Sequence, residues 1–177
     1  MTEIACAFTG HRPKSFLWKY NEAASDCVLL KDTLAKQIRL LVDSGVTEFL
    51  SGMAQGVDLW ATEIVLDLKK ENPALRLHCI LPCEGQEREW SASEQERYRS
   101  ILRQADEAIC VNQEYTADCM LVRNRYLVEH SSVLLAVYNG TYRSGTGMTI
   151  RYAKQLGREV IVIDPVSRSV SCKKTER

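Results

Sequence analysis

Three short segments combine glycines with hydroxyl or charged side chains, a combination that can bind a phosphate group. They are TGHRP at residues 9–13, SGMAQGVD at 51–58 and NGTYRSGTGM at 139–148. Each follows an apolar run that is typical of a strand. A glycine loop that leads into a helix presents unpaired backbone N–H groups and the positive end of the helix dipole, which together attract anions. We therefore predict a phosphate-bearing ligand at these loops.

The predicted roles differ along the three loops. We expect phosphate on residues 52–56 and 145–147, where glycine lets the backbone come close and nearby hydroxyls add donors. Arg12 and Arg123 would neutralise the phosphate through bidentate hydrogen bonds, and residues 9–11 would line the base or ribose. The complete set of predicted ligand-binding residues is Thr9, Gly10, His11, Arg12, Ser51, Gly52, Gly56, Asp58, Arg123, Gly140, Thr141, Ser144, Gly145, Thr146 and Gly147.

Simpler interpretations of the same residues stay open. The glycines can supply positive φ in ordinary turns, and Ser or Thr can cap helices. His11 either contacts the ligand or shuttles a proton, or it belongs to a surface turn set by Pro13. Asp58 either favours the helix dipole or holds a ribose hydroxyl. Trp90 and Tyr98 either stack on a base or cover the core.

None of the loops matches a standard nucleotide-binding fingerprint. SGMAQG has the spacing G-x-x-x-G, which is shorter than the dinucleotide motif G-x-G-x-x-G. SGTGMT lacks the Gly-Lys-Ser/Thr sequence that completes a phosphate-binding P-loop. The motifs therefore indicate an anion site without identifying the ligand.

The composition disfavours several classes of protein. The chain has 177 residues, with 23 basic and 23 acidic side chains, so zero net charge makes nucleic-acid binding an unfavoured function. It has no long apolar run and no signal-peptide pattern, so we expect a cytoplasmic location without a membrane partner. The seven cysteines lack metal-type C-x-x-C spacing, so we expect no metal site and no cofactor beyond the nucleotide-derived ligand. Cys6, Cys79 and Cys110 lie in strand-like runs, where we expect them to be buried.

Apolar runs alternate with helical patterns along most of the chain. This alternation predicts an α/β fold, namely a three-layer Rossmann-like domain over residues 1–166 with a mostly parallel sheet flanked by helices. The carboxyl ends of the parallel strands share one edge, so the three loops should meet there. We expect residues 167–177 to form a polar, disordered tail. The predicted strands are 3–9, 46–50, 75–81, 107–111, 133–138 and 159–163, and the predicted helical regions are 22–44, 57–71, 86–105, 117–131 and the segment ending at 157.

Several ordered blocks carry a family resemblance that covers residues 3–164. They are TGHRP, SGMAQGVDLWATEIV, CILPCEGQEREW, RNRYLVEHSSVLLAVYNG and GTGMTIRYA. Together they resemble the YpsA-like family of the SLOG superfamily, which also contains the DprA proteins and the LOG phosphoribohydrolases. The resemblance implies a Rossmann-like sheet, a nucleotide or nucleotide-derived ligand at the glycine loops, and a bacterial or phage setting. It further implies a sensor linked with stress or cell division.

The resemblance to the LOG enzymes favours one arginine as a ligand-binding residue and does not decide whether this chain is an enzyme. Their Met-x-x-Arg block resembles CMLVRN here, which is why Arg123, rather than Arg125, is assigned to the ligand. Where those enzymes carry a glutamate after their glycine block, this chain has Met148 and Thr149. Cleavage of an N-glycosidic bond needs a carboxylate, so the resemblance does not decide whether this chain is an enzyme. Glu84 and Asp58 are the substitutes considered.

Three functions follow from the sequence, in order of preference. The first is binding of a nucleotide or nucleotide-derived ligand, as a sensor whose loops become ordered and change a surface that a protein partner reads. The second is a hydrolase that acts on a nucleotide, at an N-glycosidic or phosphoester bond. The third is a nucleic-acid-binding or scaffold module similar to DprA. The sequence assigns neither the ligand nor the oligomeric state.

Overall fold

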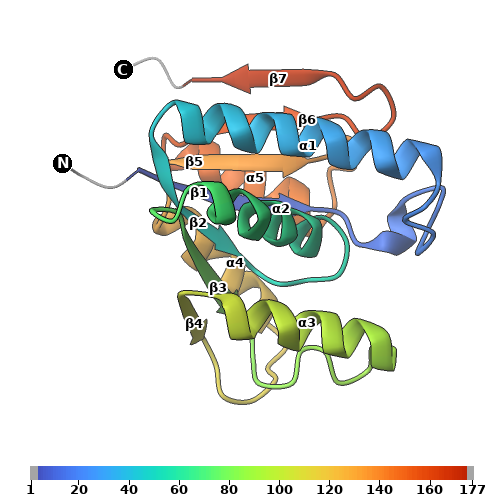
Figure 1. Ribbon diagram of the computed structural model, residues 1–177. Helices are drawn as coiled ribbons and strands as arrows, with labels where there is room; N and C mark the ends of the chain where they lie inside the picture. Colours follow the sequence, from blue (N-terminus) through green and yellow to red (C-terminus); the bar gives the residue numbers. More distant parts are fainter. Residues whose placement is uncertain (1–3, 175–177) are drawn as a thin grey trace.

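The computed structural model describes residues 4–174, which form an alternating series of strands and helices (Figure 1). Their order along the chain matches the predicted alternation. In sequence, the elements are β1 (Ile4–Gly10), the 3₁₀ turn η1 (Pro13–Ser15), α1 (Ser25–Asp43), β2 (Val46–Ser51), α2 (Val57–Glu71), β3 (Arg76–Leu81), α3 (Ala92–Gln104), β4 (Glu107–Cys110), α4 (Cys119–Glu129), β5 (Val133–Val137), α5 (Gly145–Gln155), β6 (Glu159–Ile163) and β7 (Val170–Lys173).

One sheet of seven strands, in the order β4-β3-β2-β1-β5-β6-β7, forms the middle layer. All neighbouring strands are parallel except β6 and β7, which are antiparallel. Helices α1, α2 and α3 lie on one face, and α4 and α5 lie on the other (Figure 1). The predicted three-layer α/β fold of the Rossmann type is therefore confirmed.

Alternate residues of the central strands feed two separate apolar layers. In β1, Phe8 packs into the layer under α1 to α3, whereas its neighbour Ala7 packs into the layer under α4 and α5. This follows from the strand period of two, which directs successive side chains to opposite faces. In α1, residues spaced by three or four positions close the first layer. They are Cys27, Leu30, Leu34, Ile38 and Leu41, all buried.

The strand order reverses between β1 and β5. From β1 the chain proceeds outward through β2 and β3 to β4, and it then returns through α4 to β5 on the other side of β1. Crossovers on opposite faces leave a crevice at the carboxyl ends of these two central strands. The loop at residues 11–12 after β1 and the loop at 138–144 after β5 therefore begin side by side, because Gly10 pairs with Val137.

The structure corrects the predicted disordered tail at residues 167–177. Residues 170–173 form β7 and pair with β6, while residues 175–177 lie outside the described residues. Asp164 Oδ1 accepts hydrogen bonds of 2.8 Å from the backbone N–H groups of Val166 and Ser167, which shape the turn back to the sheet. Backbone pairing with β6 holds this edge strand, together with a hydrogen bond from Cys172 Sγ to Glu159 Oε1 at 3.3 Å, and its exposed side chains carry no apolar signal.

A further difference concerns the start of α3. The predicted helical region at 86–105 becomes helical only at Ala92, because the Ser91 side chain caps α3 by accepting a hydrogen bond from Glu94 N at 3.3 Å.

Cys6 and Cys79 are buried as predicted, and burial raises the pKa of Cys79 to about 12. Cys110 is exposed, since β4 is an edge strand, which corrects the prediction for that residue.

Candidate ligand-binding site

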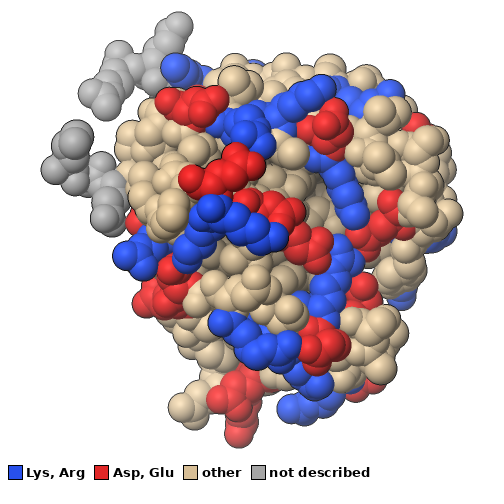
Figure 2. All heavy atoms as spheres, in the orientation of Figure 1, with Lys and Arg blue, Asp and Glu red and all other residues tan. Residues whose placement is uncertain are grey.

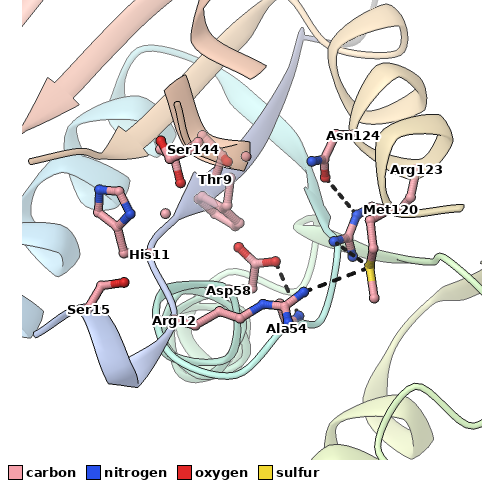
Figure 3. Close-up of a pocket in the computed structure, with 14 residues that line it drawn as sticks. Thr9, His11, Arg12, Ser15, Ala54, Asp58, Met120, Arg123, Asn124 and Ser144 are labelled. Carbon is pink, nitrogen blue, oxygen red and sulfur yellow. Dashed lines mark hydrogen bonds between the residues drawn. The ribbon is translucent and has the colours of Figure 1, made fainter. Parts of the chain in front are cut away.

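A cavity of about 310 Å³ opens at the carboxyl edge of the sheet, next to the point where the strand order reverses (Figure 3). The end of β1, the start of α2, one side of α4 and the start of α5 all contribute to its wall, so the three loops meet as predicted. The predicted residues that line it are Thr9, Gly10, His11, Arg12, Asp58, Arg123, Ser144, Gly145 and Thr146.

The start of α5 offers backbone donors to this cavity. Ser144 caps the helix, because its Oγ accepts a hydrogen bond of 3.0 Å from Gly147 N, and Ser144 O accepts one from Met148 N. Gly145 N and Thr146 N have no acceptor among the hydrogen bonds of residues 4–174. Two unpaired amides at the positive end of an eleven-residue helix form a favourable place for an anion.

Two backbone amides in the loop before α2 are already hydrogen-bonded to protein side chains, which differs from the prediction. The Ser51 hydroxyl accepts a hydrogen bond of 3.1 Å from Met53 N, and Asp58 Oδ2 accepts one of 3.2 Å from Ala54 N. Two amides that the sequence analysis assigned to phosphate therefore already bind oxygen atoms of the protein. Because a carboxylate also lies in the first turn of α2, this loop suits a hydroxyl group better than an anion.

Arg123 and Asp58 place opposite charges in the buried part of the cavity. The Arg123 guanidinium donates to Gly52 O, and its Nε donates to Asn124 Oδ1 at 2.8 Å. Burial lowers the pKa of Arg123, and the charge of Asp58 offsets part of this effect. Burial likewise raises the pKa of Asp58, and Arg123 offsets part of the rise. Each group thus reduces the cost of burying the other.

Arg12 reaches the cavity from the opposite wall. Its Nη2 lies 3.9 Å from Met120 Sδ, and Arg123 Nη2 lies 3.7 Å from the same sulfur atom (Figure 3). Arg12 lies in the exposed part of the wall, whereas Arg123 is almost fully buried. Arg12 is therefore the guanidinium that can turn towards an incoming anion at low cost.

His11 is held in its neutral form. Its Nε2 accepts a hydrogen bond of 3.0 Å from Asn139 N, and a backbone N–H can act only as a donor. Burial lowers the pKa of His11, which agrees with this assignment. The ring proton therefore resides on Nδ1, where it can be donated to a ligand in the cavity.

Six predicted residues do not line the cavity and instead shape the loops. Arg123 lies where a Cβ atom at Gly52 would project, and Gly56 has a φ of 88° with its Cα facing the His11 carbonyl. Gly147 packs closely against the carbonyl of Tyr142. The six are Ser51, Gly52, Gly56, Gly140, Thr141 and Gly147.

Four other residues in the wall were not predicted to bind the ligand. They are Phe8, Ser15, Met120 and Asn124; Ala54, from the predicted segment 52–56, also lies in the wall. Position 124 follows Arg123 directly, so the Met-x-x-Arg block could have indicated Asn124. Tyr98 is buried and Trp90 packs on its edge at a centroid distance of 5.3 Å, outside this cavity.

Charges elsewhere on the molecule are mixed. Figure 2 shows basic and acidic side chains interspersed on the face that carries α1, α2 and α3, with no large patch of one sign. Within residues 4–174, no group of three His, Cys, Asp or Glu side chains is arranged to hold a metal ion. Over the same residues, none of the helices has both the length and the apolar character that crossing a bilayer requires.

Comparison with known proteins identifies the family. The YpsA model, described as the YspA SLOG family, matches residues 6–165. The chain belongs to this family. Similar proteins include a UPF0398 protein of Bacillus velezensis, 31% identical over 75% of this chain and 74% of the relative. Another, from Bacillus thuringiensis, is 29% identical over 85% of this chain and 83% of the relative.

A solved structure shows the same fold at greater distance. The X-ray structure of TM1055, a structural genomics target, superposes on this YpsA-family chain with a TM-score of 0.55. The alignment covers 89% of this chain and 72% of that one at 17% sequence identity. At that identity the likeness supports the Rossmann-like fold alone.

Proposed function

We propose that this YpsA-family chain binds a nucleotide or nucleotide-derived ligand in the cavity at the end of β1 and β5. The observation that carries the proposal is the convergence of four separate segments on one cavity, with unpaired amides at Gly145 and Thr146 and a movable guanidinium at Arg12. These groups suit phosphate. Asp58 Oδ1, His11 Nδ1 and Ser15 supply an acceptor and donors for a ribose or base.

The charges divide the cavity into two regions. Phosphate belongs at the start of α5 beside Arg12, because Asp58 makes the start of α2 unfavourable for an anion. The ribose then lies towards Asp58, whose carboxylate accepts hydrogen bonds from hydroxyl groups. Arg123 stays paired with the protein and balances the Asp58 charge. Ligand binding would order the loops that meet here, which suits the expected role as a bacterial sensor read by a protein partner.

Calorimetric titration with nucleotides, cyclic dinucleotides and ADP-ribose derivatives tests this proposal. We expect at least one of them to bind the wild type and to bind Gly145→Val at least about tenfold more weakly, a loss of about 1.4 kcal/mol. A side chain at position 145 meets no protein atom within 4 Å, so it enters open space at the cavity wall.

A matched control separates lost binding from a weakened helix. Lys154→Val places the same β-branched side chain at an exposed position in the last turn of α5. This variant should bind like the wild type. Absence of binding by the wild type to the whole panel, or equal binding by Gly145→Val, would contradict the proposed function.

A hydrolase is a second candidate because a buried carboxyl group lines the cavity. The raised pKa of Asp58 suits a group that gives or takes a proton during cleavage of an N-glycosidic bond. Incubation of concentrated protein with nucleoside monophosphates, followed by chromatography, tests this activity. Release of free base by the wild type, and its loss in Asp58→Asn, would support a hydrolase; no release from any nucleotide would leave binding as the function.

A further inference from the structure

A second cavity, of about 320 Å³, adjoins the candidate site between α4 and α5. The two cavities share wall residues Met120, Asn124 and Gly145, so they adjoin at these residues. Their chemistry differs. The first is lined by charged and hydroxyl groups, whereas Leu121, Met148 and the Tyr152 ring make the second mainly apolar.

We propose that this second cavity holds the nucleobase of the ligand whose phosphate lies at the start of α5. The inference rests on the proposed function and specifies its ligand class, a phosphate joined through a sugar to a flat heteroaromatic ring. Two methionines border the cavity, and thioether sulfur makes favourable contacts with aromatic rings. A phosphate or sugar phosphate without a ring would leave this apolar wall in water.

The other space that adjoins the first cavity is too small to hold a base. Beneath Arg12, a recess of about 40 Å³ leads towards Trp90. The next cavity beyond it is lined by Glu22, Glu89 and Glu94, which disfavour a phosphate-bearing ligand. The α4–α5 cavity therefore offers the adjoining space that fits a base.

A small number of polar groups at the α4–α5 cavity can orient the base. Asn124 Oδ1 already accepts from Arg123 Nε, so the amide NH₂ of Asn124 is the group left to donate to a ring nitrogen or carbonyl. Thr149 Oγ1 donates to Gly145 O at 2.8 Å and remains an acceptor. The exposed Arg125 guanidinium lies 5.7 Å from the centre of the Tyr152 ring, and both residues line this cavity.

Binding of AMP, GMP, CMP and UMP, compared with ribose 5-phosphate, tests the inference by calorimetry. We expect at least one nucleotide to bind at least about tenfold more tightly than ribose 5-phosphate. Ala117→Trp fills the α4–α5 cavity from an exposed position at its rim, and Met148→Ala removes a contact to the ring. Both should weaken nucleotide binding without weakening ribose 5-phosphate binding.

A control variant tests whether an added tryptophan side chain by itself affects binding. Ala74→Trp adds the same side chain at an exposed position between α2 and β3, away from both cavities, and should leave binding unchanged. Nucleotides that bind no better than ribose 5-phosphate, or equally well to Ala117→Trp, would overturn the inference while leaving the phosphate site intact. A self-association in solution that Ala117→Trp abolishes would likewise overturn it, by assigning this face to a second copy. If neither kind of probe binds the wild type, this inference fails, and the wider panel with cyclic dinucleotides and ADP-ribose derivatives decides the proposed function separately.

Discussion

At the scale of single residues, Gly52 controls the position of Arg123. A Cβ atom at position 52 would lie 2.3 Å from Arg123 Nη1 and 2.5 Å from Cζ, too close for any real contact. The guanidinium lies directly against the backbone here and donates to the Gly52 carbonyl. Glycine is required at this position for close approach, whereas a positive φ explains Gly56.

We therefore predict that Gly52→Ala displaces the Arg123 guanidinium and weakens its electrostatic interaction with Asp58. Stability should fall by about 1–3 kcal/mol because overpacking forces a buried side chain to move. Ligand affinity should fall with it. Urea unfolding measures the first effect and calorimetry the second.

Gly145→Ala is the matched control, since its added Cβ meets open space in an ordinary helical conformation. Its stability should be unchanged or higher by about 0.4–1 kcal/mol. If Gly52→Ala were as stable as Gly145→Ala, the close packing of Gly52 on Arg123 would be incorrect.

At the scale of elements, one histidine joins three strands of the sheet. His78 of β3 bonds through Nδ1 to Glu107 of β4 at 2.8 Å, and through Nε2 to Glu48 of β2. Burial alone would lower the pKa of His78, but the hydrogen bonds to both carboxylates raise it above its ordinary value. The protonated ring thus stabilises the pairing of β2, β3 and β4.

This arrangement predicts how stability depends on pH. A histidine whose pKa is higher in the folded than in the unfolded state contributes its stabilisation fully below the unfolded pKa of about 6.5. The contribution disappears as pH rises through the folded pKa. The free energy of unfolding of the wild type should therefore decrease across this window.

Urea unfolding at a series of pH values measures the effect of His78. In His78→Gln the decrease should be smaller, while His130→Gln, an exposed histidine at the end of α4, should behave like the wild type. Equal pH profiles for the wild type and His78→Gln would show that the two carboxylates do not stabilise the charged ring.

At the scale of the whole molecule, the reversal of strand order explains why distant loops meet. Alternating strands and helices allowed the common edge to be predicted, and the apolar spacing gave the bounds of α2 and β6 at 57–71 and 159–163. Strand β7 was missed because its pairing depends on a turn and on backbone hydrogen bonds rather than on apolar side chains. Local apolar patterns predict buried helices and strands better than they predict exposed edge strands.

The location of the candidate site could be predicted from the sequence, but the role of each residue in it could not. Glycine loops indicate where a ligand can approach, but the spacing in SGMAQGVD does not show that Asp58 and Ser51 use the loop amides themselves. Nor does the sequence show that the α4–α5 cavity adjoins the first, since Met120 and Met148 come from separate helices. Such contacts depend on tertiary packing, which brings together residues that are far apart along the chain.

A crystal structure of the chain grown with the tightest-binding nucleotide of the panel would show where each part of the ligand lies. We expect phosphate oxygens within hydrogen-bond distance of Gly145 N, Thr146 N and the Arg12 guanidinium, a ribose hydroxyl at Asp58, and the base between α4 and α5. A nucleotide bound outside these two cavities, or crystals with both cavities empty after growth with saturating nucleotide, would contradict this expectation.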